Sequence, residues 1–106
     1  MPINNHQKKL LRNIGHTLKP VVTVAGNGLT ERVLQEIRRA LSDHELIKIK
    51  LAIIDRQQRS ELINDICHLT RAEAVQSIGK TTLLYLPAAT PNIKLSNVHI
   101  YRSALL

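Results

Sequence analysis

The stretch PVVTVAGNGLTERVLQEIRRALSDHELIKIKL, residues 20–51, predicts a strand, a helix and a second strand, in that order. Its beginning, PVVTVA, is mostly β-branched, which is typical of a short strand covered on both faces. Apolar residues then recur at helical spacing between residues 33 and 41, and Thr30 is placed to cap the helix that they form. Because a strand–helix–strand unit closes through a right-handed crossover, we expect its two strands to be parallel neighbours.

The second strand, ELIKIKLAII at residues 45–54, alternates between apolar and charged side chains. Lys48 and Lys50 therefore lie on the face opposite to the isoleucines, which makes that face basic and partly solvated. Two interpretations of these lysines stay open. They can belong to a binding surface, or they can be an ordinary charged strand face that discourages aggregation.

An amphipathic helix is expected before residue 20, because Pro20 pushes the residue before it towards extended geometry. At about 100° per residue, its apolar side chains fall on one face and its basic side chains on the opposite face. Gly15 weakens this helix near its end. The apolar residues are Leu10, Leu11, Ile14 and Leu18, and the basic residues are Lys8, Arg12 and His16.

The second half of the chain predicts one more helix and a hairpin. Apolar residues at helical spacing between residues 62 and 69 form a buried stripe. Two short strand candidates follow, AVQSIG at residues 74–79 and TTLLYL at residues 81–86. Lys80 lies in the loop between them, next to a glycine that suits a hairpin.

The order of these elements, α-β-α-β-α-β-β, predicts a two-layer α/β domain over residues 1–86 with a mixed sheet of about four strands. From Pro87 onwards the pattern loosens, and only a weak alternation of apolar residues remains. We therefore expect residues 87–106 to be a flexible tail or to add a strand at an edge of the sheet. We expect a monomer, with a dimer formed through this tail as the alternative.

A chain of 106 residues is expected to form one domain with an aliphatic core, since it contains no Trp or Phe. Its single cysteine, Cys67, rules out an internal disulfide and a thiolate zinc cluster, and favours a reducing compartment. No apolar run reaches the roughly 20 residues needed to span a bilayer, and the opening MPINNHQKKLLRN lacks a signal core. We expect a cytoplasmic protein without a membrane partner.

The charge of the chain favours a polyanionic partner over a merely soluble basic protein. Its 15 Lys and Arg residues against 8 Asp and Glu residues give a formal charge of +7. The first carboxylate is Glu31, so the residues before it carry positive charge alone. We expect the following basic residues of this opening segment to neutralise phosphates: Lys8, Lys9, Arg12 and Lys19.

The loop AGNG, residues 25–28, lies between the first strand and its helix and allows two interpretations. Asn-Gly is a common turn dipeptide, and a strand-to-helix junction needs a turn whether or not a ligand binds. Alternatively, the helix start presents free N–H groups, and the glycines let a phosphate reach the amides of Gly26, Asn27 and Gly28. We expect the cationic helix to pack beside this loop and to extend the anion site into a stripe.

The scarcity of aromatic residues argues against recognition of single-stranded bases, which are usually stacked on aromatic side chains. Backbone recognition of folded or double-stranded RNA needs only Lys, Arg and exposed N–H groups. Enzymatic interpretations find no support, because no Gly-Lys-Ser/Thr follows the loop and the histidines show no metal-ligand spacing. We read Cys67 as a small core residue, and expect no cofactor and no catalytic or metal site.

Four segments occur in a familiar order and spacing within residues 6–87: Leu-Lys-Pro-Val-Val, Asn-Gly-Leu-Thr-Glu, His-Glu-Leu-Ile-Lys and Ile-Gly-Lys-Thr. In these segments the chain resembles the bacterial YhbY family, the single-domain form of the chloroplast RNA splicing and ribosome maturation (CRM) domain. The resemblance implies a fold similar to the C-terminal domain of translation initiation factor 3, RNA binding, and association with precursors of the large ribosomal subunit. It also implies an RNA surface at the family's Gly-x-x-Gly loop, which corresponds to Ala25, Gly26, Asn27 and Gly28.

Two residues depart from the family pattern. Ala25 stands at the first glycine position of the loop, although Gly26 next to it restores some backbone freedom. Leu86 stands where the family commonly has an arginine, so a contact made by that arginine is absent.

The function that we expect is binding to the phosphate backbone of structured ribosomal RNA during assembly of the large subunit. Lys48, Lys50 and Lys80 are candidates of second rank for this surface. The alternative is a protein-interaction module that docks on ribosomal proteins.

Overall fold

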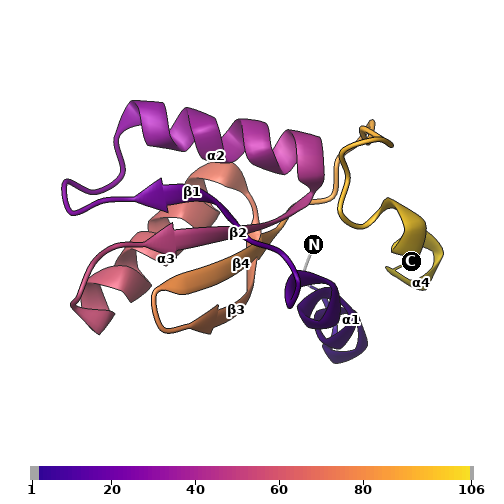
Figure 1. Cartoon of the computed structure of the whole chain (residues 1–106), viewed down its shortest axis with the longest axis horizontal. Coiled ribbons are helices and arrows are strands. Elements are labelled where there is room, and N and C mark those ends of the chain that lie inside the picture. The colour runs from indigo at the N-terminus through magenta and orange to yellow at the C-terminus, as the bar shows by residue number, and fades with distance from the viewer. Residues whose placement is uncertain (1–2, 106) are drawn as a thin grey trace.

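The computed structural model describes residues 3–105 as a four-stranded sheet with helices on both of its faces (Figure 1). The elements are α1 Asn5–Gly15, β1 Pro20–Val24, α2 Glu31–His44, β2 Leu46–Leu51, α3 Arg56–Thr70, β3 Glu73–Ile78 and β4 Thr81–Tyr85. They are followed by the 3-10 helix η1 His99–Tyr101 and by α4 Arg102–Leu105. The predicted order of elements and the mixed sheet are confirmed. Among residues 3–105, none of the helices combines the length and the hydrophobicity that a membrane span requires.

The sheet has the strand order β1-β2-β4-β3. β1 and β2 are parallel, as the strand–helix–strand unit predicts, and the hairpin of β3 and β4 is antiparallel. β4 also pairs with β2 in the antiparallel sense, with Leu83 opposite Lys48. The hairpin therefore places its second strand between β2 and β3, so the second strand–helix–strand unit does not give parallel neighbours. β1 and β3 are the two edges of the sheet.

α2 and α3 cover one face of the sheet. Ile37 of α2 and Ile66 of α3 are fully buried in the core on this side. β2 contributes every second side chain to the same core, namely Ile47, Ile49 and Leu51. The alternation read from the sequence is therefore the alternation seen in the sheet.

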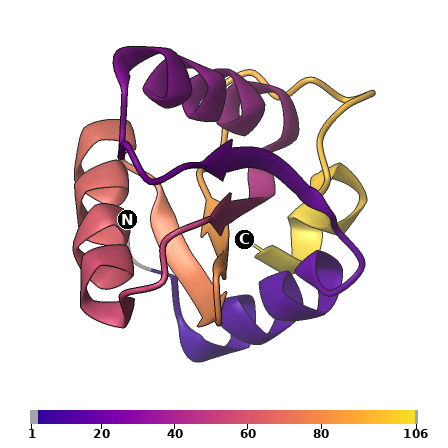
Figure 2. The ribbon, with the colours of Figure 1, turned by 60° about the vertical axis from the view of Figure 1, so that its left-hand side comes forward.

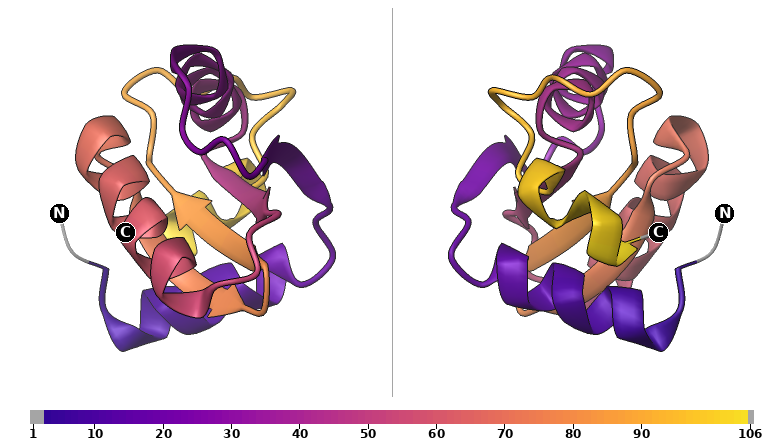
Figure 3. Two further views of the ribbon diagram at one scale, coloured as in Figure 1. Left: turned by 90° about the vertical axis from the view of Figure 1, so that its left-hand side faces the viewer. Right: turned by 90° about the vertical axis from the view of Figure 1, so that its right-hand side faces the viewer.

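α1 lies on the opposite face of the sheet from α2, as Figure 2 and Figure 3 show. Leu11 of α1 is fully buried in a second core together with Leu46 at the beginning of β2. Gly15 lets the end of α1 sit directly on β4, because a Cβ at this position would lie 2.5 Å from Cδ2 of Leu83. The two layers expected from the sequence are thus extended by a third, partial layer.

The basic residues of α1 do not lie opposite its buried side. Lys8 and Arg12 are half-buried, whereas Lys9 is exposed. The buried stripe is centred on Leu11 and Gly15, and at 3.6 residues per turn Lys8 and Arg12 are only about 60° and 100° from Leu11. They therefore form one flank of the helix, which corrects the opposite face expected from the sequence.

The tail after residue 86 adds no strand to the sheet within the described residues, which corrects that part of the expectation. Val98 is 0% exposed and fills the core beneath α1, while Ile93 and Ile100 are 66% and 81% exposed. The weak alternation in the sequence thus reflects one buried residue and not a strand face. The division of the chain at residue 86 stays a prediction.

Glu45, between α2 and β2, holds this tail in place. Its carboxylate is 0% exposed and accepts hydrogen bonds from Arg102 Nη2 at 2.6 Å, from the Ser96 hydroxyl at 2.5 Å and from the Ala88 amide at 2.7 Å. Burial alone would raise the pKa of Glu45. The three hydrogen bonds and the charge of Arg102 outweigh burial and hold this pKa below its usual value.

Candidate nucleic-acid interface

Residues 25–28 form an exposed turn between β1 and α2, at the left edge of Figure 1. The Gly28 amide donates to the Ala25 carbonyl at 3.0 Å and closes the turn. Gly28 has a φ of +83°, which residues with a side chain rarely adopt, so this glycine serves the turn itself. A Cβ at Gly26 would meet no heavy atom within 4 Å. The turn is therefore open on its outer side.

The turn leaves fewer amides for a ligand than the sequence suggested. The Gly28 amide is used inside the turn, so Gly26 and Asn27 carry the amides that a phosphate could reach. Thr30 caps α2 as predicted, because its hydroxyl oxygen accepts a hydrogen bond from the Val33 amide at 3.2 Å. The loop thus supports both interpretations. Gly28 is needed for the turn, and Gly26 leaves space in which a phosphate could approach.

Lys50 and Lys80 lie at the same end of the sheet as the turn. The Ala52 amide donates to the Val24 carbonyl at 2.8 Å, which keeps the ends of β1 and β2 together. The Leu51 amide donates to the Lys80 carbonyl at 2.7 Å, which places the hairpin loop next to the end of β2. Both lysines are exposed at this end of the sheet.

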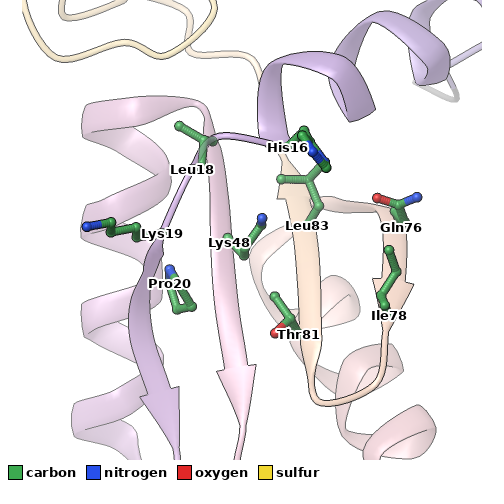
Figure 4. Close-up of a pocket in the computed structure, with 9 residues that line it drawn as sticks. All are labelled: His16, Leu18, Lys19, Pro20, Lys48, Gln76, Ile78, Thr81 and Leu83. Carbon is green, nitrogen blue, oxygen red and sulfur yellow. The ribbon is translucent and has the colours of Figure 1, made fainter.

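Lys48 and Lys50 point to the same face of the sheet as α1, because they alternate with the buried isoleucines of β2. The register places Lys48 opposite Leu83 and Lys50 opposite Thr81. α1 packs over Leu46 and leaves this further part of the face uncovered. Figure 4 shows Lys48 at the centre of the uncovered area.

α1 does not lie beside the turn, which corrects the stripe expected from the sequence. It packs at the beginning of β2, whereas the turn follows the end of the parallel strand β1, so the two are at opposite ends of the sheet (Figure 1). Lys48 and Lys50 lie between them. Lys19 is exposed and extends past β1, away from Lys48 (Figure 4).

Two arginines that the sequence analysis did not select lie at the turn's end of the sheet. Arg56 and Arg59 belong to the first helical turn of α3 and line a hollow together with Gly79 of the hairpin loop. Arg59 Nη1 donates to the carbonyl oxygens of Ile53 and Ile54, both at 2.6 Å, which fixes its guanidinium. Arginine at a helix start is unusual, since the helix dipole favours acidic residues there, and this signal could have identified both.

We give the name basic surface to a set of residues that begins on the face of the sheet that carries Lys48 and Lys50 and continues around the turn's end of the sheet to the start of α3 on the other face. They are the turn 25–28, Lys48, Lys50, Arg56, Arg59 and Lys80. The ion pairs within the described residues are Arg32 with Glu36 and Arg102 with Glu45, so none of them neutralises this surface. Asp55 is a carboxylate at its border, and its Oδ1 is used to accept a hydrogen bond from the Gln57 amide at the start of α3. The surface therefore keeps a positive charge for an anionic ligand.

Two observations on the described residues concern groups that could take part in catalysis. Cys67 of α3 packs against the core between the sheet and the helices α2 and α3. Burial raises the pKa of its thiol, so the nucleophilic thiolate is disfavoured. Within residues 3–105, no three His, Cys, Asp or Glu side chains gather where they could hold a metal ion.

Comparison with known proteins gives matches over nearly the whole chain. Residues 3–85 match the model of the CRS1 / YhbY (CRM) domain. The chain is 52% identical over 98 residues to the "Probable RNA-binding protein PA4753" of Pseudomonas aeruginosa, covering 92% of this chain and 94% of that protein. It is 46% identical over 93 residues to an "RNA-binding protein" of Haemophilus influenzae, covering 88% of this chain and 94% of that protein.

A solved structure has the same fold. The solution structure of the hypothetical protein SAV1595 from Staphylococcus aureus superposes with a TM-score of 0.76 at 26% sequence identity. The match covers 89% of this chain and 97% of that chain.

Proposed function

The chain belongs to the CRS1/YhbY (CRM) domain family, and on this premise we propose that it binds structured RNA through the sugar-phosphate backbone. Relatives of 52% and 46% identity are named as RNA-binding proteins, which supports this proposal. The proposed role is non-enzymatic and cytoplasmic, and the protein acts as a monomer. The RNA that we propose is ribosomal RNA in precursors of the large subunit, and this finer statement rests on the family resemblance.

The observation that carries the proposal is the open turn at residues 25–28 beside exposed basic side chains. Phosphate oxygens would accept hydrogen bonds from the amides of Gly26 and Asn27, where no side chain at Gly26 keeps them at a distance. Lys50 and Lys80 would neutralise the neighbouring phosphates. Lys48 and the flank of α1 would continue the contact along a strand that is about 20 Å long, from six residues at about 3.3 Å each.

A pair of substitutions at Gly26 tests this contact. Gly26→Asp places a carboxylate where the phosphate is proposed to lie, and Gly26→Asn adds an uncharged side chain of almost the same shape. We expect the Asp variant to bind a folded ribosomal RNA fragment about tenfold more weakly than the Asn variant, since hydrogen bonds to charged groups contribute on this scale. Fluorescence anisotropy measures the affinity, and equal affinities of the two variants would exclude a phosphate at the turn.

Both variants are expected to fold, because Gly26 has no positive φ and faces open space. Equal melting temperatures of the two variants and the natural chain serve as the control.

A second experiment addresses the identity of the RNA. Crosslinking the protein to RNA in cells and sequencing the bound RNA should return large-subunit precursors. Association with ribosomal particles that survives nuclease treatment would instead favour docking on ribosomal proteins.

A further inference from the structure

The uncovered face of the sheet contains a hollow of about 350 Å³, and Lys48 of β2 is one of the residues that line it (Figure 4). Its apolar lining includes Leu18, the buried Leu83 and the exposed Ile78. Lys48, Gln76 and Thr81 bring polar groups to it. Small-molecule sites commonly combine an apolar lining with a few polar groups, and this volume is at the lower end of their range.

The strand register explains why these side chains meet. Gln76 of β3 and Lys48 of β2 both lie opposite Leu83 of β4, so the three form one row across the sheet. Ile78 and Lys50 both lie opposite Thr81 and form the next row towards the turn. α1 packs over the neighbouring row on the side away from the turn. Its close approach to Leu83 closes the hollow at that end.

We propose that this hollow receives the base of one unpaired nucleotide when the protein binds RNA. The inference rests on the proposed function, because the basic surface would hold the sugar-phosphate chain beside the hollow. A base is flat and largely apolar on its faces, with hydrogen-bonding groups at its edge. The side-chain amide of Gln76 offers both donor and acceptor groups, and the hydroxyl of Thr81 does the same.

Charge and chemistry favour this occupant. His16, Lys19 and Lys48 line the hollow, and none of the residues 3–105 that line it is acidic, so an anionic nucleotide is attracted to it. A paired base stays inside its helix and cannot enter, whereas a bulged or looped base can turn out of the stack. The hollow therefore adds a preference for an unpaired nucleotide to a surface that otherwise contacts the backbone.

A comparison of two RNA hairpins tests the proposal, one fully paired and one with a single bulged nucleotide. We expect the natural chain to bind the bulged hairpin about tenfold more tightly, which corresponds to one or two hydrogen bonds and a buried base. Gln76→Leu and Thr81→Val replace polar groups by apolar ones of comparable size and should bring this ratio close to one. Gln35→Leu, at an exposed position on α2, is the matched control and should keep the ratio.

A fluorescent base gives a second measurement. With 2-aminopurine at the bulge, binding should raise the emission, since the base leaves the stack that quenches it. A natural chain that binds both hairpins equally, or a ratio that Gln76→Leu leaves unchanged, would overturn the base site while the proposed function stands. Failure to bind either hairpin or any folded ribosomal RNA fragment would instead overturn the proposed function itself.

Discussion

Gly26 and Gly28 are two residues apart in one turn, yet they should respond differently to the same substitution. Gly28 has a φ of +83°, and a side chain in this left-handed region costs about 1–2 kcal/mol. We therefore expect Gly28→Ala to lower the free energy of unfolding by about that amount. Gly26→Ala has no such strain and should change it by less than about 0.5 kcal/mol. Urea unfolding measures both, and equal losses would contradict the assigned backbone conformations.

The residues of this turn could be predicted from the sequence because their signals are local. The Asn-Gly pair indicates a turn, and Thr30 indicates the start of a helix three residues before the amide that it caps. The use of the Gly28 amide inside the turn could not be predicted. Arginine at a helix start could have drawn attention to Arg59, but its place beside Gly79 could not be predicted, because it depends on how α3 and a distant hairpin meet.

The ion pair of Glu45 and Arg102 joins the tail to the residue between α2 and β2. Their side chains are 0% and 32% exposed, respectively, so water screens this pair only in part. Arg102→Ala would leave a buried carboxylate without one of its donors, and we expect the free energy of unfolding to fall by about 1–3 kcal/mol. Arg32→Ala removes an exposed pair with Glu36 and should cost less than about 0.5 kcal/mol. Similar losses in these two variants would contradict the role of the tail.

The same carboxylate makes stability depend on pH. The pKa of Glu45 is lower in the folded chain than its ordinary value of 4.5, so its contribution is fully present above that value and is lost as the pH falls through the folded pKa. We therefore expect the free energy of unfolding to decrease as the pH falls below that ordinary value, and not between neutral pH and that value. The decrease should be smaller in Glu45→Gln than in the natural chain. Glu36→Gln, at an exposed position, serves as the control and should show the full decrease.

Elements of the first half of the chain were predictable, and the tail was not. β2 and α2 each have a complete hydrophobic period, which determines the face that they bury. The tail has one fully buried apolar residue, Val98, and is held by polar contacts to residues far away in the sequence. No local pattern in the sequence indicates contacts between residues so far apart. The weak apolar alternation therefore predicted a strand that the structure does not contain.

At the scale of the whole molecule, the net charge of +7 predicts RNA binding that weakens with salt. The logarithm of the affinity should fall with the logarithm of the salt concentration by about 0.7–0.9 per phosphate engaged. Lys50→Gln and Lys80→Gln should each reduce this slope by about one, since each lysine faces the proposed backbone. Lys94→Gln, in the exposed part of the tail, should leave the slope unchanged. A slope that is the same in all variants would exclude phosphate contacts at the turn's end of the sheet.

The arrangement of the surface as a whole could be predicted only in part. The fold, the turn and the alternation of Lys48 and Lys50 follow from the sequence, because each has its own period or dipeptide. The end of the sheet over which α1 packs does not follow from the sequence, because it depends on whether Leu11 contacts the beginning or the end of β2. The helix was therefore expected beside the turn, and the open sheet face between them was missed.

The contact between Gly15 and Leu83 has a practical consequence for attempts to stabilise this protein by mutation. Replacing a helical glycine by alanine is a routine way to strengthen a helix, with a gain of about 1 kcal/mol in the ordinary case. Here the added methyl group would lie 2.5 Å from Cδ2 of Leu83, so either the end of α1 or the side chain of Leu83 has to shift. Because Leu83 also lines the hollow, Gly15→Ala would change the border of the proposed base site.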